Sequence, residues 1–336
     1  MKNSVAPGSP GFPGWPPRWA CGLCLCVLAL MLPTLTATAA DYPTRPIRVV
    51  VPFVAGGGTD LLARLISQRL GDLLGQQIVV DNRGGAASTL GTQIVAKATP
   101  DGYTLGIFDT AFAINPSVTP NLPYDSERDF EFIAIIATSP SLLVTHPGLK
   151  VRTLQELIDL ARRKPGQIKF ASSGVGTSGH LTAQMFMTAA KISLLHVPFK
   201  GAGASIVDVI GGHTDLTTVV PGSVIPHLKS GALLPLAITG KQPYHMLPSV
   251  PTFASQGLES VNPGAFRFLA APAGVPAAVL KKLTAIMRVV MEPADLRKRL
   301  ADNGFDAELR TEADARSYIV QEMRKWQQAV KDAKAK

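Results

Sequence analysis

Cysteine is nearly absent from this chain of 336 residues, and its position excludes several classes of site. The three cysteines, Cys21, Cys24 and Cys26, all lie within the first 40 residues. The remainder of the chain therefore has no thiol that could form a disulfide or bind a metal as a thiolate. None of the three follows the apolar run behind a small residue, as the anchor cysteine of a lipoprotein would.

Long hydrophobic runs are also scarce. One apolar run, at residues 21–32, follows Lys2 and Arg18 and precedes the small residues at 37–40. This order predicts a secretory signal peptide over residues 1–40, so we expect the protein in the periplasm. No later run approaches the ~20 apolar residues that a membrane-spanning helix needs.

Basic residues outnumber acidic ones, but they are not distributed as in a nucleic-acid-binding protein. The chain has 33 Lys and Arg against 24 Asp and Glu, a formal net charge of +9. The basic residues are scattered or gathered near the C-terminal end with few aromatic residues between them, which indicates a solvated helix face. We therefore expect no nucleic-acid partner.

The segments after residue 46 alternate between strand-like and helix-like patterns, which predicts an α/β fold with mainly parallel sheets. The later part of the chain predicts three helices, at 277–291, 293–303 and 311–333, whereas the polar stretch 115–129 has no clear period. A folded part of about 300 residues is larger than a single hydrophobic core usually supports, which indicates two domains. We predict one lobe from residues 41–143 and 237–336, an inserted second lobe from 144–236, and a ligand cleft between them.

Three apolar, strand-like runs pass into glycine-rich turns that open helices. The first turn spans residues 56–60, the second 172–178 and the third 201–205. A helix N-terminus has unpaired N–H groups and about half a positive charge, and glycine lets a ligand approach closely. Several such junctions around one cleft predict a site for a small organic carboxylate.

Other interpretations of these junctions fail on particular residues. The first turn lacks the Gly-Lys-Ser/Thr of a phosphate-binding loop. The GxGxxG pattern at 174–179 lacks the acidic residue expected at the end of the next strand of a dinucleotide site. No GxSxG elbow occurs, and the six histidines lack metal-ligand spacing. The sequence therefore predicts no metal, no cofactor and no catalytic residue.

Lys200 is the one basic side chain within a glycine junction. It can simply solvate the turn, or it can form a charge-assisted contact with a ligand carboxylate. The sequence leaves both roles open.

The chain resembles the Bug family of periplasmic solute receptors, the substrate-binding components of tripartite tricarboxylate transporters. The likeness runs over essentially all of the chain after the signal segment, in many short ordered motifs. These motifs are Pro-Ile-Arg at 46–48, Val-Pro-Phe at 51–53, Gly-Gly at 56–57, Asp60, Ala-Arg at 63–64, Asp-Asn-Arg-Gly-Gly-Ala at 81–86, Pro-Asp-Gly-Tyr-Thr-Leu at 100–105, Ala-Ser-Ser-Gly at 171–174, Val-Pro-Phe-Lys-Gly-Ala-Gly at 197–203, Gly-Gly at 211–212, Asp215, Pro-His at 226–227 and Ala-Pro-Ala-Gly-Val-Pro at 271–276.

The resemblance implies a two-lobed, type II periplasmic-binding-protein fold that closes on a small organic anion. It also implies that backbone N–H groups and ordered water at the first two junctions hold the ligand carboxylate. The candidate residues carried over by position are Gly57, Gly58, Thr59, Asp60, Ser172, Ser173, Gly176, Thr177 and Ser178, with Thr110, Ala111, Lys200, Gly201 and Ala202 as weaker candidates.

Two departures from the family pattern concern the identity of the ligand. Val219 and Val220 stand where many relatives have an Asp-Asn pair, and Phe-Arg-Phe at 266–268 stands where they have an aromatic residue, any residue and glycine. Losing the aspartate removes a partner for an ammonium or hydroxyl group, which favours a less polar carboxylate over an amino acid. The partner is then a membrane transporter or the ectodomain of a sensor. An enzyme that uses the same cleft is the remaining alternative.

Overall fold

The structure is a computed structural model that describes Met1, Asn3, Gly8 and residues 42–119 and 121–334. The chain forms a compact unit over residues 41–336. Residues 9–40 of the expected signal peptide, with its cleavage site, lie outside the described residues, so the signal peptide stays a prediction. Among the described residues, no helix is both long and apolar enough to cross a membrane.

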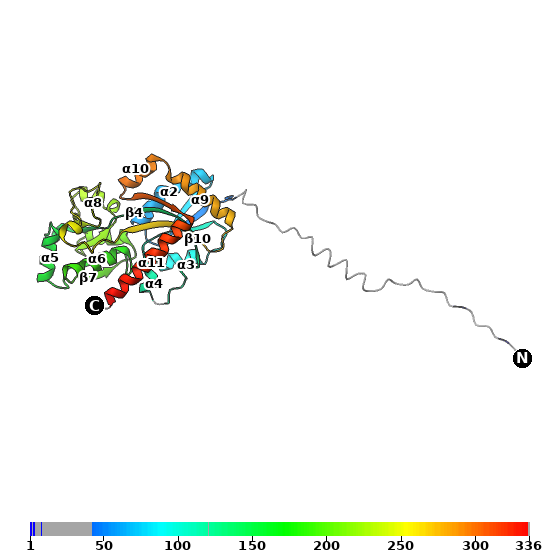
Figure 1. Cartoon of the computed structure of the whole chain (residues 1–336), viewed down its shortest axis with the longest axis horizontal. Coiled ribbons are helices and arrows are strands. Elements are labelled where there is room, and N and C mark those ends of the chain that lie inside the picture. The colour runs from blue at the N-terminus through cyan, green and yellow to red at the C-terminus, as the bar shows by residue number, and fades with distance from the viewer. Residues whose placement is uncertain (2, 4–7, 9–41, 120, 335–336) are drawn as a thin grey trace. The chain divides into compact units, whose positions relative to one another are not determined.

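The first sheet has six strands in the order β11-β4-β10-β3-β1-β2 (Figure 1). These strands are β1 (Ile47–Val51), β2 (Ile78–Asn82), β3 (Thr104–Asp109), β4 (Phe130–Ser139), β10 (Ala265–Pro272) and β11 (Asp306–Thr311). The helices that accompany it are α2 (Gly58–Leu74), α3 (Thr89–Ala96), α4 (Ala111–Val118), α9 (Ala277–Met291), α10 (Ala294–Asp302) and α11 (Glu312–Lys334). Buried side chains of α2, α9 and α10 pack on one face of the sheet, and those of α3, α4 and α11 pack on the other.

The second sheet has five strands in the order β7-β6-β8-β5-β9. These strands are β5 (Leu142–Thr145), β6 (Lys169–Ser172), β7 (Leu195–Pro198), β8 (Leu216–Val219) and β9 (Leu234–Ile238). Its helices are α5 (Leu154–Arg163), α6 (Ser178–Ala190), α7 (Ala202–Ile210) and α8 (Ile225–Lys229), with short 3-10 turns η3 (Pro147–Leu149), η4 (Pro221–Ser223) and η5 (Ala254–Gln256). The α/β class with two sheets flanked by helices is thus confirmed.

Both sheets are mixed, so the prediction of mainly parallel sheets is wrong in this respect. The pairings β1–β2, β1–β3, β6–β7 and β6–β8 are parallel. The strands β10, β4 and β11 pair antiparallel, as do β5, β8 and β9. The chain passes from one sheet to the other between β4 and β5 and again between β9 and β10, and these four strands pair antiparallel with their neighbours. The parallel pairs are joined by helical crossovers.

The lobe boundaries at 143/144 and 236/237 stay a prediction, but the strands suggest a refinement. Leu142 and Leu143 belong to β5, and β9 extends to Ile238. Phe253 and Val261 lie in the same buried cluster as the helices of the second sheet. We would therefore draw the boundaries near Ser141 and near Gly264.

Two elements were not expected from the sequence. Helix α4 begins directly after β3 and runs into the polar stretch 115–129. Its buried residues are only Ala111 to Asn115, and Pro116 follows. Strand β11 pairs antiparallel with β4 at the sheet edge. Its sequence, Asp-Ala-Glu-Leu-Arg-Thr, is mostly charged or polar, which is common for edge strands and obscures the apolar pattern.

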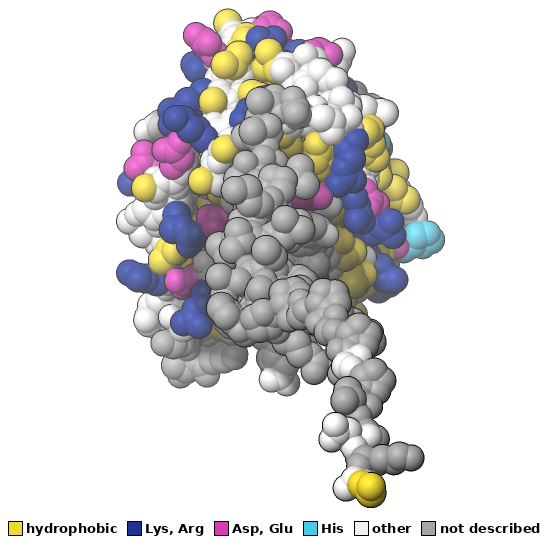
Figure 2. Space-filling view, turned by 90° about the vertical axis from the view of Figure 1, so that its right-hand side faces the viewer, with side chains coloured by type: hydrophobic (Ala, Val, Ile, Leu, Met, Phe, Trp, Pro, Cys, Tyr) yellow, Lys and Arg dark blue, Asp and Glu magenta, His cyan; other side chains and the backbone are white. Residues whose placement is uncertain are grey.

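Charged side chains are dispersed over the face of the molecule shown in Figure 2. Lys and Arg side chains there lie among Asp, Glu and hydrophobic side chains and form no single basic surface on that face.

Aromatic rings form the densest part of the core between the first sheet and α4. Phe108, Phe112, Phe130 and Phe268 are buried, with neighbouring ring centroids 5.0 to 5.6 Å apart. Since Phe108 directly precedes Asp109, the last residue of β3, this packing holds the end of that strand in place.

Replacing Phe108 by alanine should lower the free energy of unfolding by about 3–5 kcal/mol, because it leaves a cavity among packed rings. Urea denaturation followed by circular dichroism measures this change. Leu90→Ala, on a side chain that is 48% exposed, is the control and should stay within about 0.5 kcal/mol of the parent. Equal losses in both variants would contradict the importance of the cluster.

Candidate functional site

One small cavity is lined by residues from both sheets and has a volume of ≈ 40 Å³. By the measure in which one water needs about 10–15 Å³, this is room for a group of carboxylate size. The lining residues are Phe53, Gly57, Gly58, Thr59, Asp109, Ser141, Ser173, Ser178, Gly179, Ala202, Thr218, Val219, Val220, Ala265 and Arg267. Six of the predicted site residues are among them: Gly57, Gly58, Thr59, Ser173, Ser178 and Ala202.

The first junction presents the N-terminus of α2 to the cavity. Gly57 is the N-cap and offers no side chain to satisfy the first amides of the helix. Those N–H groups have no intrahelical partner, so they remain available to an anion. A Cβ atom on Gly58 would lie 2.8 Å from Cγ2 of Val220, so glycine is needed here for the close approach of the two lobes.

The second junction presents the N-terminus of α6 from the other sheet. Thr177 is its N-cap and accepts a hydrogen bond from the His180 N–H at 3.4 Å, while Ser178 and Gly179 line the cavity. The Thr218 hydroxyl donates to the Gly179 carbonyl at 2.7 Å and ties this helix to β8. Two helix N-termini therefore border one enclosed space.

The third junction supports the first and contributes little to the cavity itself. Of its residues only Ala202 is in the cavity wall. Its backbone meets the first junction, where the Val54 N–H donates to the Lys200 carbonyl at 3.5 Å. Gly201 has φ of +149° and its Cβ would lie 2.8 Å from Cγ2 of Val54, so the two loops touch.

Lys200 does not line the cavity, and its side chain is exposed. Of the two roles left open by the sequence, the position favours solvation of the turn. The loop directs the carbonyl of this residue inward and its ammonium group outward.

The remaining predicted residues lie beside the cavity with their polar groups already paired. In the first lobe, an Asp60 oxygen accepts from the Gly56 N–H at 3.0 Å, and the Thr110 hydroxyl accepts from the Phe266 N–H at 3.0 Å. The Ala111 N–H donates to Asp109 Oδ1 at 2.8 Å. Asp60, Thr110 and Ala111 build the turns and are not in the cavity wall.

In the second lobe, Ser172, Gly176 and Thr177 likewise form the turn. The Ser172 hydroxyl lies 2.6 Å from His196 Nε2. The Gly176 N–H donates to His180 Nδ1 at 3.2 Å, and the Thr177 hydroxyl donates to the Gly174 carbonyl at 2.7 Å. Gly201 completes the set of predicted residues outside the cavity wall.

Arg267 and Asp109 are cavity residues that the sequence-based prediction did not include. They are paired across neighbouring strands, Arg267 at the beginning of β10 and Asp109 at the end of β3. Arg267 is 3% exposed and Asp109 is 9% exposed. The signal in the sequence is a charge inside the otherwise apolar run Phe-Arg-Phe-Leu-Ala-Ala at 266–271.

Burial dominates the electrostatics of this pair. It raises the pKa of Asp109, although the charge of Arg267 and hydrogen bonds from Ala111 and Thr59 act in the opposite direction. Burial also lowers the pKa of Arg267 to about 10, with Asp109 opposing the shift. The guanidinium is therefore still protonated at neutral pH.

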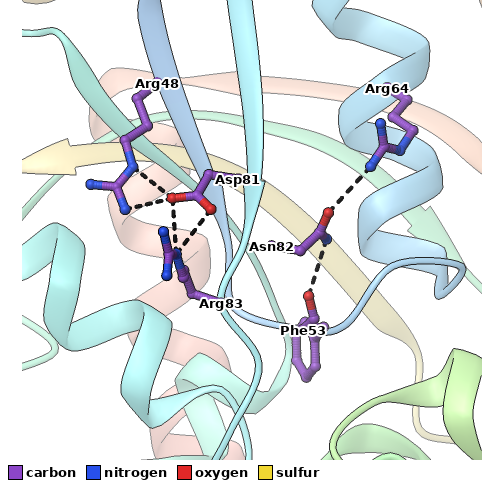
Figure 3. Close-up of polar contacts among 6 residues, drawn as sticks. All are labelled: Arg48, Phe53, Arg64, Asp81, Asn82 and Arg83. Atoms are coloured by element: carbon purple, nitrogen blue, oxygen red, sulfur yellow. Dashed lines mark hydrogen bonds and ion pairs between the residues drawn. The ribbon is translucent and has the colours of Figure 1, made fainter.

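A network next to the first junction explains the Asp-Asn-Arg motif at 81–83 (Figure 3). The Asn82 side-chain amide donates to the Phe53 carbonyl at 3.1 Å and accepts from Arg64 at 3.2 Å. Arg48 and Arg83 both donate to Asp81; burial acts to raise the pKa of this carboxyl, but the two arginines lower it overall. The motif thus positions the turn that leads to the cavity.

The sequence profile of the Tripartite tricarboxylate transporter family receptor matches residues 62–334 of this chain. The chain belongs to this receptor family. The receptor is 32% identical over 301 residues to BugT of Bordetella pertussis, which covers 89% of this chain and 92% of BugT. It is therefore a Bug-type receptor.

Solved structures of similar proteins share its fold. The periplasmic binding protein BugD is 29% identical, with a TM-score of 0.83 over 87% of this chain and 98% of BugD. Rpa4515 of R. palustris with adipate is 31% identical, with a TM-score of 0.84 over 87% of this chain and 98% of the other. MatC from Rhodopseudomonas palustris with bound malate is 29% identical, with a TM-score of 0.80 over 87% of this chain and 99% of MatC. The receptor therefore has the two-lobed periplasmic-binding-protein fold.

Within residues 42–119 and 121–334, no group of three His, Cys, Asp or Glu side chains is arranged to hold a metal ion. The histidines nearest the site, His180 and His196, instead stack on one another with ring centroids 4.3 Å apart.

The stacked histidine pair predicts acid sensitivity. Burial, followed by the charge of His196, lowers the pKa of His180 from 6.5 to about 4. Between these values the unfolded chain binds a proton that the folded receptor does not, so stability is lost as the pH falls from 6.5 towards 4. His180→Gln removes this proton uptake, and its melting temperature should fall less between pH 7 and pH 5 than that of the parent.

Differential scanning fluorimetry at both pH values measures this difference. His213→Gln, on an exposed side chain, is the control and should follow the parent. An equal fall in melting temperature for His180→Gln and the parent would contradict the contribution of His180.

Proposed function

We propose that this protein is a periplasmic receptor that captures a small organic carboxylate between its lobes and delivers it to a tripartite tricarboxylate-type membrane transporter. One observation carries the proposal. The N-terminus of α2, which packs on the first sheet, and that of α6, which packs on the second, border one enclosed cavity. A signal peptide over residues 1–40 would direct the chain to the periplasm.

The polar groups of the cavity favour an anion. The first amides of α2 and α6 supply N–H donors and partial positive charge, and hydroxyl groups come from Ser173 and Ser178. Such donors suit a carboxylate, which accepts several hydrogen bonds at once. The carboxylates named in the structures of Rpa4515 and MatC support this class of ligand.

The rest of the cavity favours an aliphatic remainder on the ligand. Phe53, Val219, Val220 and Ala265 supply apolar walls. An ammonium group would meet the positive charge of Arg267 in the cavity wall. Asp109 opposes that charge, but it already accepts hydrogen bonds at Oδ1 from the Ala111 N–H and at Oδ2 from the Thr59 hydroxyl. This arrangement supports a carboxylate without an amino group.

A receptor accounts for the site better than an enzyme does. In the Ser172–His196 pair, the arrangement most similar to a nucleophile with its base, the serine is buried in the turn and neither residue lines the cavity. A receptor should return its ligand unchanged, so chromatography of the acid after incubation should recover all of it. Consumption of the acid would favour the enzyme.

Lobe closure is part of the proposal, and three close contacts between segments of the two lobes support it. Gly58 faces Val220, Val54 bonds to Lys200, and Gly222 faces Asn303. A ligand that contacts both lobes favours the arrangement in which these contacts form. Exchange between open and closed forms would then admit and release the ligand.

Thermal-shift screening with adipate, malate, succinate and butyrate tests the proposal directly. An acid present at about 100 times its Kd should stabilise the receptor by ~2.7 kcal/mol and raise its melting temperature. Gly57→Val should weaken binding of that acid at least about tenfold, since branched carbons would occupy the space in front of the α2 amides. A receptor stabilised by none of the four acids would contradict carboxylate capture.

Gly264→Val is the matched control, because a Cβ atom on Gly264 meets nothing within 4 Å. Its affinity for the acid should equal that of the parent. Unchanged affinity in Gly57→Val would remove the first junction from the site.

Gly222→Ala tests closure apart from the cavity. A Cβ atom there would lie 1.6 Å from the Asn303 carbonyl oxygen, so alanine should keep η4 and α10 apart and weaken acid binding without touching the ligand. Small-angle scattering with saturating acid should show a larger radius of gyration than for the parent. Gly264→Ala is the control, and a compact, tightly binding Gly222→Ala variant would contradict closure by this contact.

A further inference from the structure

The cavity contains one cationic side chain, and neither the glycine junctions nor the family motifs account for it. We propose that Arg267 binds a carboxylate oxygen of the ligand directly and makes the receptor specific for an ionised acid over its neutral analogue. This inference rests on the proposed function and assigns its specificity to one residue.

The position of Arg267 places its charge beside the first junction. The side chain is 3% exposed and lies in the cavity wall. Its Nη2 would be 3.4 Å from a Cβ atom on Gly58, the first residue of α2. An anion at the N-terminus of α2 would therefore meet the guanidinium as well as the backbone amides.

The hydrogen-bonding capacity of Arg267 is only partly used. Nη1 donates to the Ser139 hydroxyl at 2.5 Å, and the guanidinium lies 5.3 Å from the centre of the Phe305 ring. Nε is buried and has no acceptor among the described residues. An arginine carries five N–H donors, so this one retains donors for a ligand.

The charge of Arg267 is also incompletely balanced. Asp109 is its cross-strand neighbour, yet the part of the chain that the structure describes contains no ion pair within 4.0 Å between them. Both oxygens of Asp109 already accept hydrogen bonds from the turn before α4 and from Thr59. A buried charge without a close partner is costly, and a carboxylate in the cavity would remove that cost.

The surroundings of Arg267 hold the guanidinium in a defined place. Ser139 at the end of β4 and Phe305 beside α10 contact it from two sides. A guanidinium that is already oriented loses little side-chain entropy on binding, which makes arginine effective for carboxylates. An arginine with a purely structural role is expected to donate a hydrogen bond from its Nε and to form a close ion pair with an Asp or Glu side chain.

A thermodynamic cycle between ligand charge and protein charge tests this role. The probes are butyrate with butyramide, succinate with succinamide and adipate with adipamide, each measured by isothermal titration calorimetry at pH 7. The amides keep the shape of the acids and lack the charge. In Arg267→Gln, acid affinity should fall about 10- to 100-fold while amide affinity changes little, so the ratio of acid to amide affinity falls at least about tenfold.

Arg267→Lys and Arg45→Gln complete the design. The lysine variant keeps the charge and should recover part of the acid affinity that glutamine loses. Arg45 is exposed and paired with Asp101, so Arg45→Gln removes the same charge from the surface and should bind like the parent. If Arg267→Gln does not fold, the resonance of Arg267 Nε in the parent is the readout: it should shift with acid and stay in place with amide.

The outcomes separate this inference from the proposed function. If the parent binds none of the three acids, the receptor proposal fails and this inference fails with it. If the parent binds an acid but Arg267→Gln loses acid and amide affinity equally, Arg267 has a structural role only. The same conclusion follows if its Nε resonance does not respond to the acid.

Discussion

Two helix N-termini from different sheets can border one small cavity only if the turns that lead into them come very close. Gly58 leaves room for Val220, and Gly179 packs against Thr218, with no Cβ atom between them. The helices α2 and α6 can then direct unpaired amides into the same enclosed space. Every other feature of the site, including the contact of the third junction with the first, depends on this close approach.

The electrostatic character of the site follows from that geometry. Partial positive charge from two helices and the buried guanidinium of Arg267 meet the single carboxylate of Asp109, whose oxygens are occupied by the fold. Apolar neighbours such as Phe53 and Val220 exclude water and strengthen each interaction. A small anion with an aliphatic remainder fits both parts of this environment.

Local patterns in the sequence predicted most elements because their causes are local. The period of α9 predicted residues 277–291, which are the observed bounds. The predictions failed where long-range pairing decides the outcome. The edge strand β11 depends on β4, and the mixed sheets depend on the route of the chain between the lobes.

The sequence by itself determined the α/β class, the three strand-to-helix junctions and the likeness to Bug receptors, because each rests on short motifs read in order. It could not distinguish junction residues that face the cavity from those that bond within their own turn. Ser173 faces it, whereas the hydroxyl of Ser172 turns to His196. Only the tertiary structure brought Arg267 beside Gly58, since 208 residues lie between them in the chain. Strand β10 pairs with β3, and β3 pairs with β1, the strand that leads into α2.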